Sequence, residues 1–448
     1  MNKAGPILMR ISFVLIALIL LSACLLFYHI SRDRAATAMQ AKKVFILRQG
    51  DRFSLIRNGQ PFFVKGAAGG SNLAELKKAG GNTLRTWDTT NLRQLLDEAS
   101  ANNIAIIAGL SLPFSFTPSF YNDPVKLEAQ FNAYREIVRT YRSHPALLMW
   151  GLGNEVDFPY SYRFRHFYRA YNELLAMIHK EDPDHPVSTA LINLEQRNIF
   201  NIKLKVPNLD LITINSFGKL SEAREDLERL SWFWKGPFMI TEWGINGPWE
   251  TESTAWGAPI EPSSTKKAEQ YLERSGYLPV DNPRFLGACC FYWGQKQEVT
   301  HTWFSFFSEN GKSSEVVNIM NSLWTGQQTA DHAPAIRYML VEGKGARDNI
   351  LLKPDSLYTA ELLMDSSAVN APTELVWELL KEDWFRKNPR DLNFIKPSSF
   401  DSLLEPCPGN RVRFRTPATE GPYRIFVTVY DNKGYFSTTN TPFYVVQK

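Results

Sequence analysis

The sequence has few cysteines, and neither sign of charge dominates it. Four cysteines in 448 residues exclude the disulfide framework that stabilises small secreted domains. Fifty basic and 46 acidic residues give a formal net charge of +4, which does not favour nucleic-acid binding. No histidines and cysteines have zinc-site spacing, and no Gly-x-Gly-x-x-Gly pattern follows a predicted strand, which argues against a doubly wound nucleotide-binding sheet. We therefore expect no metal and no cofactor.

Aromatic residues, in contrast, are abundant. They make up 13% of the chain, as 12 tryptophans, 17 tyrosines and 29 phenylalanines. Such side chains fill large cores, and they also stack on flat apolar ligand surfaces. The length exceeds that of one ordinary domain and suits a large barrel with a smaller partner. Composition alone does not separate the two uses of the aromatic residues.

An uncharged apolar run of 18 residues, Ile11–Tyr28, lies near the amino terminus. Its length is at the lower limit for crossing a bilayer. We favour an uncleaved signal anchor, with residues 1–43 forming the membrane segment and a polar tether. The alternative is a lipoprotein signal in which Cys24 would carry the lipid. Either interpretation attaches the protein to the membrane and places the remaining chain outside the cytoplasm, on the periplasmic or extracellular side.

Beyond the tether, short apolar runs alternate with longer amphipathic stretches. Eight runs have the length and composition of buried strands, and eight such alternations over about 280 residues are typical of a (β/α)8 barrel. We predict this TIM barrel, of the α/β class, over residues 44–326, with a β-hairpin at its start around Asn58 and Gly59. The predicted strands are Phe62–Gly66, Thr83–Trp87, Ile104–Leu112, Leu147–Gly153, Pro186–Asn193, Leu209–Phe217, Pro237–Gly244 and Phe285–Gly294.

The pattern changes beyond Gly326. A linker-like stretch is followed by segments in which apolar and polar residues alternate with a period of two, as in Tyr358–Met364 and Tyr423–Tyr430. Several such strands separated by turn residues are typical of a β-sandwich. We predict that residues 327–448 form a linker and a small, immunoglobulin-like sandwich domain.

Polar and aromatic residues mark the ends of the predicted barrel strands, where barrel enzymes carry their active sites. Two of these ends hold carboxylates, Glu155 and Glu242, and an acid at the end of a buried strand has a desolvation cost that calls for a reason. Paired carboxylates across a cleft are what cleavage of a glycosidic bond requires. The strand-end residues, in chain order, are Arg85, Trp87, Asn154, Glu155, Asn215, Glu242, Trp243 and Trp293.

The sequence around both carboxylates resembles a known family. Gly153–Glu155 and Ile240–Gly244 are similar to the catalytic motifs of the large (β/α)8 clan of retaining β-glycosidases. The segments Phe62–Gly66 and Gly80–Arg85 are similar to the first two strands of such barrels. The nearest resemblance is to the barrel domains of glycoside hydrolase family 2 and to family 5 enzymes, and it covers residues 45–325.

This resemblance implies roles for both carboxylates. Glu155, after the fourth strand, would be the general acid/base, and Glu242, after the seventh, would be the nucleophile. Their carboxyl groups should lie about 5–5.5 Å apart. A structural alternative is that both acids are merely ion-pair partners bridged by Arg85.

The resemblance also implies a substrate-binding set. Asn154 would hydrogen-bond the sugar 2-hydroxyl, Arg85 would hold Glu242 ionised, and Trp293 would form the apolar floor beneath the sugar ring. Many relatives carry a tyrosine where this chain has Phe217, which cannot supply a hydroxyl to the nucleophile. The set is completed by Trp87, Asn215 and Trp243.

Four tryptophans cluster in or just after the last strand ends, which favours stacking on sugar for this group. They are Trp243, Trp249, Trp256 and Trp293. Trp87 and Trp150 suit a core position and a ligand-facing position equally well.

The leading functional hypothesis is a membrane-anchored retaining β-glycosidase or transglycosidase that acts on a β-linked polysaccharide or oligosaccharide by double displacement. The alternative is a non-catalytic glycan-binding or scaffolding protein that kept the barrel, and it predicts that Glu242 is blocked or lies far from Glu155. The sequence identifies neither the sugar and its linkage, nor endo or exo action, nor the oligomeric state.

Overall fold

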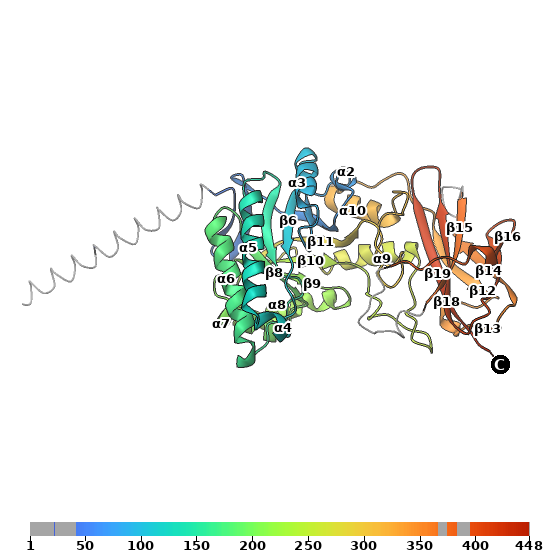
Figure 1. Cartoon of the computed structure of the whole chain (residues 1–448). Helices are drawn as coiled ribbons and strands as arrows, with labels where there is room; N and C mark the ends of the chain where they lie inside the picture. The colour runs from blue at the N-terminus through green and yellow to red at the C-terminus, as the bar shows by residue number, and fades with distance from the viewer. Residues whose placement is uncertain (1–21, 23–41, 366–373, 383–394, 448) are drawn as a thin grey trace, which may run out of the picture.

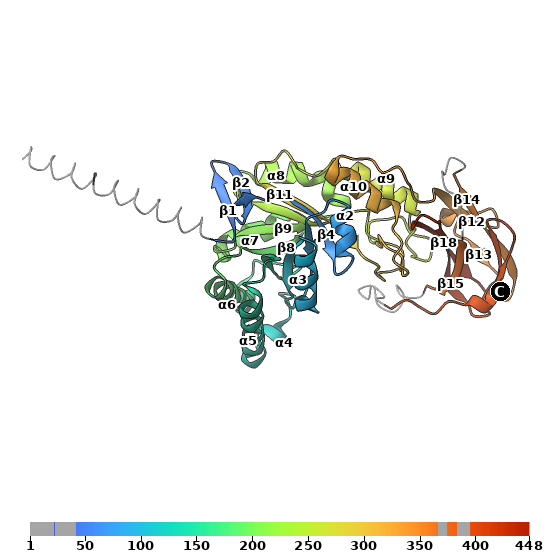
Figure 2. The ribbon, with the colours of Figure 1, turned by 90° about the horizontal axis from the view of Figure 1, so that it is seen from above.

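A computed structural model of the chain describes residues 22, 42–365, 374–382 and 395–447. The molecule is elongated, with a barrel at one end and a β-sandwich at the other (Figures 1 and 2). The predicted membrane segment Ile11–Tyr28 falls almost wholly outside the described residues. Within the described residues, no helix is both long enough and apolar enough to cross a bilayer.

The predicted barrel is confirmed. Eight parallel strands close on themselves in the order β10-β11-β4-β5-β6-β7-β8-β9, and each overlaps one of the eight apolar runs. Almost every strand residue is buried, which is why these segments read as continuous apolar runs and do not alternate. The strands are β4 (Val64–Gly69), β5 (Thr83–Arg85), β6 (Ala105–Leu110), β7 (Leu147–Leu152), β8 (Val187–Ile192), β9 (Leu211–Asn215), β10 (Phe238–Trp243) and β11 (Phe285–Trp293).

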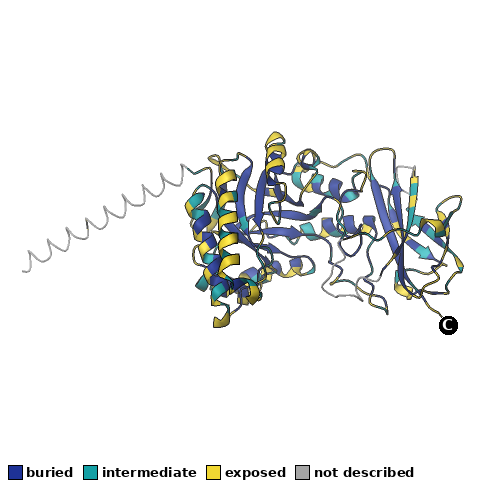
Figure 3. Cartoon of the chain, viewed as in Figure 1, coloured by how far each residue is buried: buried dark blue, intermediate teal, exposed yellow. Residues whose placement is uncertain are grey.

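Amphipathic helices surround the barrel. Figure 3 shows the dark blue of buried strands enclosed by helices whose outer faces are yellow, the colour of exposed residues. The helix α6 illustrates the cause, because its apolar residues recur at helical spacing from Phe167 to Ile178 and face the strands. The helices are α2 (Leu73–Lys78), α3 (Leu92–Ala101), α4 (Pro118–Tyr121), α5 (Pro124–Tyr141), α6 (Arg165–Glu181), α7 (Gln196–Lys205), α8 (Ala223–Leu230), α9 (Ser264–Ser275) and α10 (Glu315–Thr325).

A small antiparallel sheet covers the amino end of the barrel. It consists of β1 (Val44–Gln49), β2 (Arg52–Arg57) and β3 (Gln60–Pro61). Val44 N–H donates to the Asp184 carbonyl and Phe53 N–H to the Pro283 carbonyl, and these acceptors lie three and two residues before the barrel strands β8 and β11. The sheet therefore closes the end of the barrel opposite to the carboxyl ends of the strands.

The C-terminal part is a sandwich of two four-stranded sheets. Buried residues of both sheets, such as Val341, Phe414, Ile425 and Phe443, form one apolar core that is separate from the barrel core. The first sheet has the order β12 (Ile336–Val341), β14 (Leu357–Met364), β17 (Arg411–Arg415) and β16 (Leu404–Pro406). The second has the order β13 (Leu351–Leu352), β19 (Phe436–Val445), β18 (Gly421–Tyr430) and β15 (Glu374–Lys381).

The two domains are joined by direct hydrogen bonds. At the start of α9, Ser264 Oγ accepts from Thr438 N–H of β19 at 2.8 Å. Phe436 N–H of the same strand donates to the Ser313 carbonyl at 3.0 Å. The helix α9 lies between barrel and sandwich in both views (Figures 1 and 2). Because β19 makes both of these hydrogen bonds, this strand belongs to the sandwich and also forms part of the contact between the domains.

Candidate active site

Five of the predicted polar residues meet at the carboxyl ends of the barrel strands. Arg85 ends β5, Asn215 ends β9, and Glu242 lies one residue before the end of β10. Asn154 and Glu155 follow β7. The first three are buried, with exposed fractions of 2–5%, and hydrogen bonds connect all five. Closure of the barrel thus brings together residues that lie far apart in the sequence.

The carboxylate of Glu242 receives three hydrogen bonds on a single oxygen. Arg85 Nη1 donates to Oε1 at 2.5 Å, Trp87 Nε1 at 2.7 Å and Asn215 Nδ2 at 2.8 Å. In the part of the chain that the structure describes, no side chain or backbone group donates to Oε2. A guanidinium and two N–H donors hold this carboxylate in one orientation, and they leave its second oxygen free to form a bond.

The amide of Asn215 joins the two carboxylates. Its Nδ2 lies 2.8 Å from Glu242 Oε1 and 3.0 Å from Glu155 Oε1. The two oxygens are therefore no farther apart than the sum of these distances, which is below the separation of roughly 6.5–9.5 Å of an inverting pair. Thr241 Oγ1 donates to Asn215 Oδ1 at 3.1 Å, which turns the amide nitrogen toward the carboxylates.

Asn154 is held through its oxygen. Arg85 Nη2 and Asn215 Nδ2 both donate to Asn154 Oδ1, the latter at 3.1 Å. The Asn154 Nδ2 group donates to no protein acceptor among the described residues, and the side chain is only partly buried. Its two N–H donors are therefore available to a ligand hydroxyl, as the resemblance implies.

The backbone at the end of β7 is unusual. Glu155 has a φ of 53° and Gly153 a φ of 84°, so both lie in the left-handed region. For a residue other than glycine this conformation costs roughly 1–2 kcal/mol, and such strain tends to collect at functional sites. Gly153 has little freedom to change, because a Cβ there would lie 2.4 Å from Val156 Cγ2.

The surroundings of Glu155 favour its protonated form. Burial of the carboxyl group, together with the negative charge of Glu242, raises the pKa of Glu155. The amide of Asn215 and the charge of Arg85 oppose this rise, and Glu298 adds to it. Glu155 therefore retains its proton more readily than an ordinary glutamate, a property that suits a general acid.

Comparison with known proteins agrees with this geometry. Residues 88–247 match the model of the glycosyl hydrolases family 2, TIM barrel domain. This part of the barrel is therefore similar to the family 2 barrel domain. The match includes both carboxylates, whereas Arg85 and Trp87 lie just before it. No curated protein matches the sequence of the chain.

Solved structures with the same fold include two β-glucuronidases. The enzyme of Bifidobacterium dentium, in complex with coumarin-3-O-glucuronide, has a TM-score of 0.50 and 18% identity, over 63% of this chain and 49% of its own. The enzyme of Faecalibacterium prausnitzii also has a TM-score of 0.50 and 18% identity, over 64% and 52% of the two chains. This chain therefore spans about half the length of these proteins, and at such identity the likeness establishes the fold.

Aromatic rings lie beside the two carboxylates of the site. Trp87 stacks on Tyr292, with ring centroids 5.8 Å apart and an angle of 20° between the planes. It also meets the edge of Phe291 at 5.8 Å. Trp87 is partly exposed, so the predicted site position is open to a ligand, although its indole N–H is used by Glu242. Sequence reasoning missed Tyr292 and Phe291, whose only signal is their place near the end of the last barrel strand.

The structure corrects the predicted position of two tryptophans. Trp293 is 0% exposed and donates from Nε1 to the Asn72 carbonyl at 3.0 Å, so it does not form an exposed floor. Trp243 is 2% exposed and packs on Tyr271 of α9. Side chains of successive strand residues point to opposite faces, and Trp243 faces the helices because its neighbour Glu242 faces the barrel interior.

The two remaining tryptophans of the predicted sugar-stacking group lie in different places. Trp249 is 58% exposed and meets the edge of Phe217 at 6.1 Å, at the side of the site. Trp256 packs on Tyr444 of the sandwich, away from the carboxylates. Phe217 itself is buried against Phe291, so its ring fills space and the donor to the nucleophile comes from elsewhere.

Two charged residues at the site were also missed. Lys296 and Glu298 lie in the loop after β11 and form an ion pair of 2.5 Å. The ammonium group of Lys296 lies 5.8 Å from the Trp87 ring centroid, and the charge of Glu298 acts on Glu155. Opposite charges two residues apart are common on surfaces, so the sequence offered no signal to separate this pair from others.

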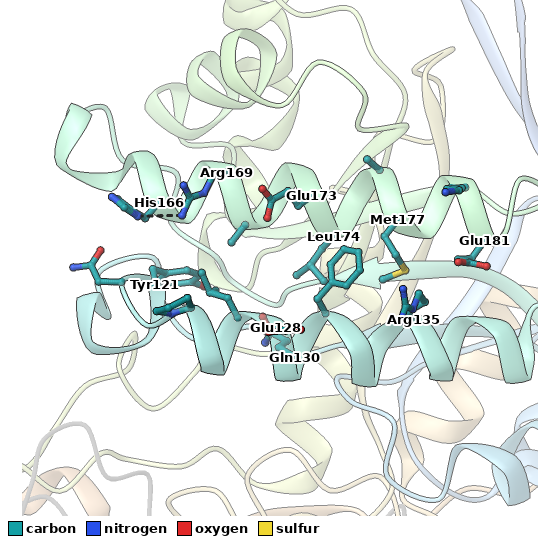
Figure 4. A pocket seen from close by; sticks show the side chains of 17 residues that line it. Tyr121, Glu128, Gln130, Arg135, His166, Arg169, Glu173, Leu174, Met177 and Glu181 are labelled. Atoms are coloured by element: carbon teal, nitrogen blue, oxygen red, sulfur yellow. Dashed lines mark hydrogen bonds between the residues drawn. The ribbon is translucent and has the colours of Figure 1, made fainter.

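A groove of about 870 Å³ lies outside the barrel, between α5 and α6 (Figure 4). Its lining combines apolar residues such as Leu174 and Met177 with charged ones such as Arg135 and Glu173. No residue of the strand-end cluster contributes to it. The groove is a furrow between two packed helices and has no convergent set of catalytic groups.

Within the described residues no cluster of His, Cys, Asp or Glu could hold a metal ion.

Proposed function

We propose that the chain is a retaining β-glycosidase or transglycosidase that acts on a β-linked glycan. The observation that carries this proposal is the single Asn215 amide that contacts both Glu155 and Glu242. These contacts limit the distance between the two Oε1 atoms to less than the separation of an inverting pair, which supports a covalent intermediate over direct attack by water. The match of the barrel to the family 2 domain supports the same assignment.

In the first step, Glu242 Oε2 attacks the anomeric carbon while Glu155 donates its proton to the leaving oxygen. The three donors on Oε1 hold the Glu242 carboxylate in one orientation, so little reorganisation is needed as the bond forms. The raised pKa of Glu155 suits a general acid. The free N–H donors of Asn154 are placed to bind the sugar 2-hydroxyl, a contact that strengthens as charge develops on the ring.

In the second step, Glu155 acts as a base. It removes a proton from water, or from an acceptor sugar, which attacks the anomeric carbon and releases Glu242. Hydrolysis and transglycosylation use the same residues and differ only in the acceptor. Trp87, Tyr292 and Trp249 provide partly exposed rings around the site, which favours a glycan with more than one sugar unit.

The alternative of a non-catalytic glycan-binding barrel rests on Phe217. It predicts separated or blocked carboxylates, and the contacts of Asn215 argue against that arrangement. Trp87 also supplies a donor to Glu242, so the absence of a tyrosine hydroxyl leaves the nucleophile with a neutral donor all the same.

The proposal is tested by activity on a panel of aryl β-glycosides and β-linked polysaccharides, with the full chain in detergent. The panel includes β-glucuronides, because the solved neighbours named above are β-glucuronidases. We expect turnover with retention of anomeric configuration, followed by NMR, and covalent labelling of Glu242 by a fluorosugar inactivator. No turnover and no labelling across the panel would sink the proposal, and an inverted product would refute the mechanism.

We also propose that Ile11–Tyr28 anchors the chain in a membrane, with the barrel outside the cytoplasm. The support is the length and uncharged character of this run. Cys24→Ala distinguishes the two kinds of anchor. If a signal anchor holds the protein, the variant stays in the membrane fraction and wild type takes up no labelled fatty acid. Labelling of wild type that is lost in Cys24→Ala would establish the lipoprotein form instead.

A further inference from the structure

The loop after β11, residues 294–302, brings charge to the catalytic centre. The Lys296 ammonium lies 4.8 Å from the ring centroid of Phe291 and 5.5 Å from that of Tyr292. A cation over aromatic faces is attracted by their electron density. The same ammonium pairs with Glu298, whose side chain is only 7% exposed. The loop thus adds one partly buried ion pair to the wall of the site.

This loop has a strained backbone. Val299 has a φ of 68°, and a β-branched residue with positive φ is a genuine outlier. On either side of it, Glu298 and Thr300 exchange backbone hydrogen bonds of 3.0 and 2.8 Å. A strained backbone of this kind persists only where contacts with the surrounding structure hold it in place. Two sets of contacts do so here.

The first constraint is a buried carboxylate of the barrel domain. Glu261 accepts hydrogen bonds from Thr300 Oγ1 at 2.7 Å and from Thr302 Oγ1 at 2.8 Å. Lys267 of α9 donates to Glu261 Oε1 and to the Thr302 carbonyl, both at 2.6 Å. Glu261 and Lys267 therefore fix the end of the loop.

The second constraint comes from the sandwich. Asn440 of β19 donates from Nδ2 to Glu261 Oε2 at 2.7 Å and accepts from Arg424 Nη1 at 2.7 Å. Arg424 of β18 also donates to the Pro259 carbonyl at 2.6 Å. Both side chains are buried, and both reach across the domain boundary.

A further contact is made by the loop itself. His301 Nε2 lies 3.1 Å from Glu378 Oε2 of β15, and its ring packs against Phe426 of β18 with centroids 4.8 Å apart. The loop that borders the catalytic centre is therefore held by the barrel on one side and by three strands of the sandwich on the other.

We propose that the C-terminal sandwich is a positioning element of the catalytic centre, which clamps Glu261 and His301 so that the loop keeps Lys296 and Glu298 beside the catalytic carboxylates. This inference rests on the proposed function. It assigns the sandwich a part in catalysis through the loop and does not require it to bind glycan.

The consequence for chemistry follows from the charges that face Glu155. These are Glu242 from β10, Arg85 from β5 and Glu298 from the loop, with Lys296 paired to Glu298. Glu298 raises the pKa of Glu155. If the loop withdraws, this contribution is lost, the pKa of Glu155 falls, and the acid becomes deprotonated at a lower pH.

Hydrogen exchange of the loop in the full chain tests the clamp without reference to activity. Asn440→Ala removes the contacts with Glu261 and Arg424, and we expect peptides covering residues 294–302 to exchange at least tenfold faster. Thr441→Ala is the control, because Thr441 donates to the Met339 carbonyl within the sandwich and does not reach the loop. Equal exchange in Asn440→Ala and wild type would overturn the clamp. Should Asn440→Ala fold poorly, Asn440→Asp is the second variant. It places a carboxylate opposite that of Glu261 and should likewise speed the exchange of residues 294–302.

The pH dependence of kcat/KM tests the catalytic consequence. Glu298→Gln should shift the alkaline limb to lower pH, Asn440→Ala should shift it in the same direction, and Thr441→Ala should leave it in place. Loss of thermal stability in Asn440→Ala with an unmoved limb would show a purely structural sandwich and overturn the proposal. If wild type turns over no glycoside, the proposed function fails, and the exchange experiment still decides the clamp.

Discussion

Two buried ionic clusters of this protein have the same components and different connections. At the catalytic centre, Glu242 faces Arg85 and the amide of Asn215. At the domain interface, a second carboxylate faces a cation and an asparagine amide. That cluster consists of Glu261, Lys267 and Asn440. All the charged side chains of both clusters are at most 7% exposed.

The difference lies in how the carboxylate oxygens are used. Glu261 accepts hydrogen bonds on both oxygens, from Lys267 and Thr302 on Oε1 and from Thr300 and Asn440 on Oε2. Glu242, in contrast, gathers its donors on Oε1 alone. A fully bonded carboxylate contributes to structure, whereas one free oxygen beside a fixed one is suited to attack a carbon atom. The hydrogen bonds therefore separate Glu242, the proposed nucleophile, from Glu261, an acid with a structural role.

The largest expected effect concerns the free oxygen. Glu242→Gln should lower kcat/KM by at least about 10⁴-fold, because the amide nitrogen is no nucleophile. Stability should also fall, because Arg85 loses its counter-ion, but the amide oxygen can still accept the three hydrogen bonds while the amide nitrogen occupies the unbonded position. Steady-state kinetics and thermal unfolding of the variant check both expectations. Residual activity above about 1% of wild type would contradict the role of Glu242.

The same substitution at the interface should lower stability further, because Glu261 has hydrogen-bond donors on both of its oxygens. Glu261→Gln leaves Lys267 without its counter-ion and turns an N–H group toward a donor, and breaking a buried ion pair costs about 3–5 kcal/mol. The midpoint of thermal unfolding should fall well below that of Glu242→Gln. If Glu242→Gln proved the less stable of the two, the distinction between the clusters would be wrong.

A third expectation concerns the pH dependence of the contribution that Glu378, at the domain interface, makes to stability. Burial opposes ionisation of Glu378, but the hydrogen bonds and charges of His301 and Lys396 outweigh it and lower its pKa from 4.5 to about 2. The stability from Glu378 is therefore present above about pH 4.5 and is lost as pH falls from there toward 2. It amounts to on the order of 3 kcal/mol at neutral pH.

Thermal unfolding of Glu378→Gln and wild type between pH 6 and pH 2 measures this contribution. We expect the difference between the two proteins to be greatest above pH 5 and to shrink toward pH 2. A constant difference across this range would mean that Glu378 titrates no differently in the folded and unfolded states. Lys396→Met is a useful second variant, because it removes one of the two hydrogen-bond partners of Glu378 and should reduce the effect without abolishing it.

The sequence was sufficient for the barrel because its signal is local. Each buried strand is an apolar run, and the topology of a parallel barrel then places all strand ends on one face. Arg85, Asn154, Glu155, Asn215 and Glu242 could therefore be grouped before any distance was known. The motifs around the two carboxylates reinforced this grouping through their resemblance to family 2 barrels.

The sequence did not predict the position of Trp293 or the cluster at the domain interface. Trp293 follows Phe291 by two residues and should share its face, but the pairing of β11 with β4 shifts register between them, and such an irregularity turns side chains to the other face. The interface cluster could not be predicted from the sequence for another reason. Its members Glu261 and Asn440 are 179 positions apart, and neither lies in a motif, so only the folded structure brings them together.

The smallest expected effect concerns the neutral donor to the nucleophile. Trp87→Phe keeps the ring that stacks on Tyr292 but removes the N–H donated to Glu242 Oε1. A hydrogen bond to a charged group contributes about 1.5–3 kcal/mol, so formation of the glycosyl-enzyme should slow roughly 10- to 100-fold. The rate of Glu242 labelling by a fluorosugar measures this step directly.

Trp243→Phe is the matched control for this last experiment. Trp243 is also a strand-end tryptophan, but it packs on Tyr271 in the helix layer, so its truncation should lower stability and leave the labelling rate nearly unchanged. Equal labelling rates in Trp87→Phe and wild type would show that Arg85 and Asn215 alone orient the nucleophile. The expected contrast instead assigns Trp87 to the catalytic cluster, where an indole N–H supplies the neutral donor that Phe217 cannot.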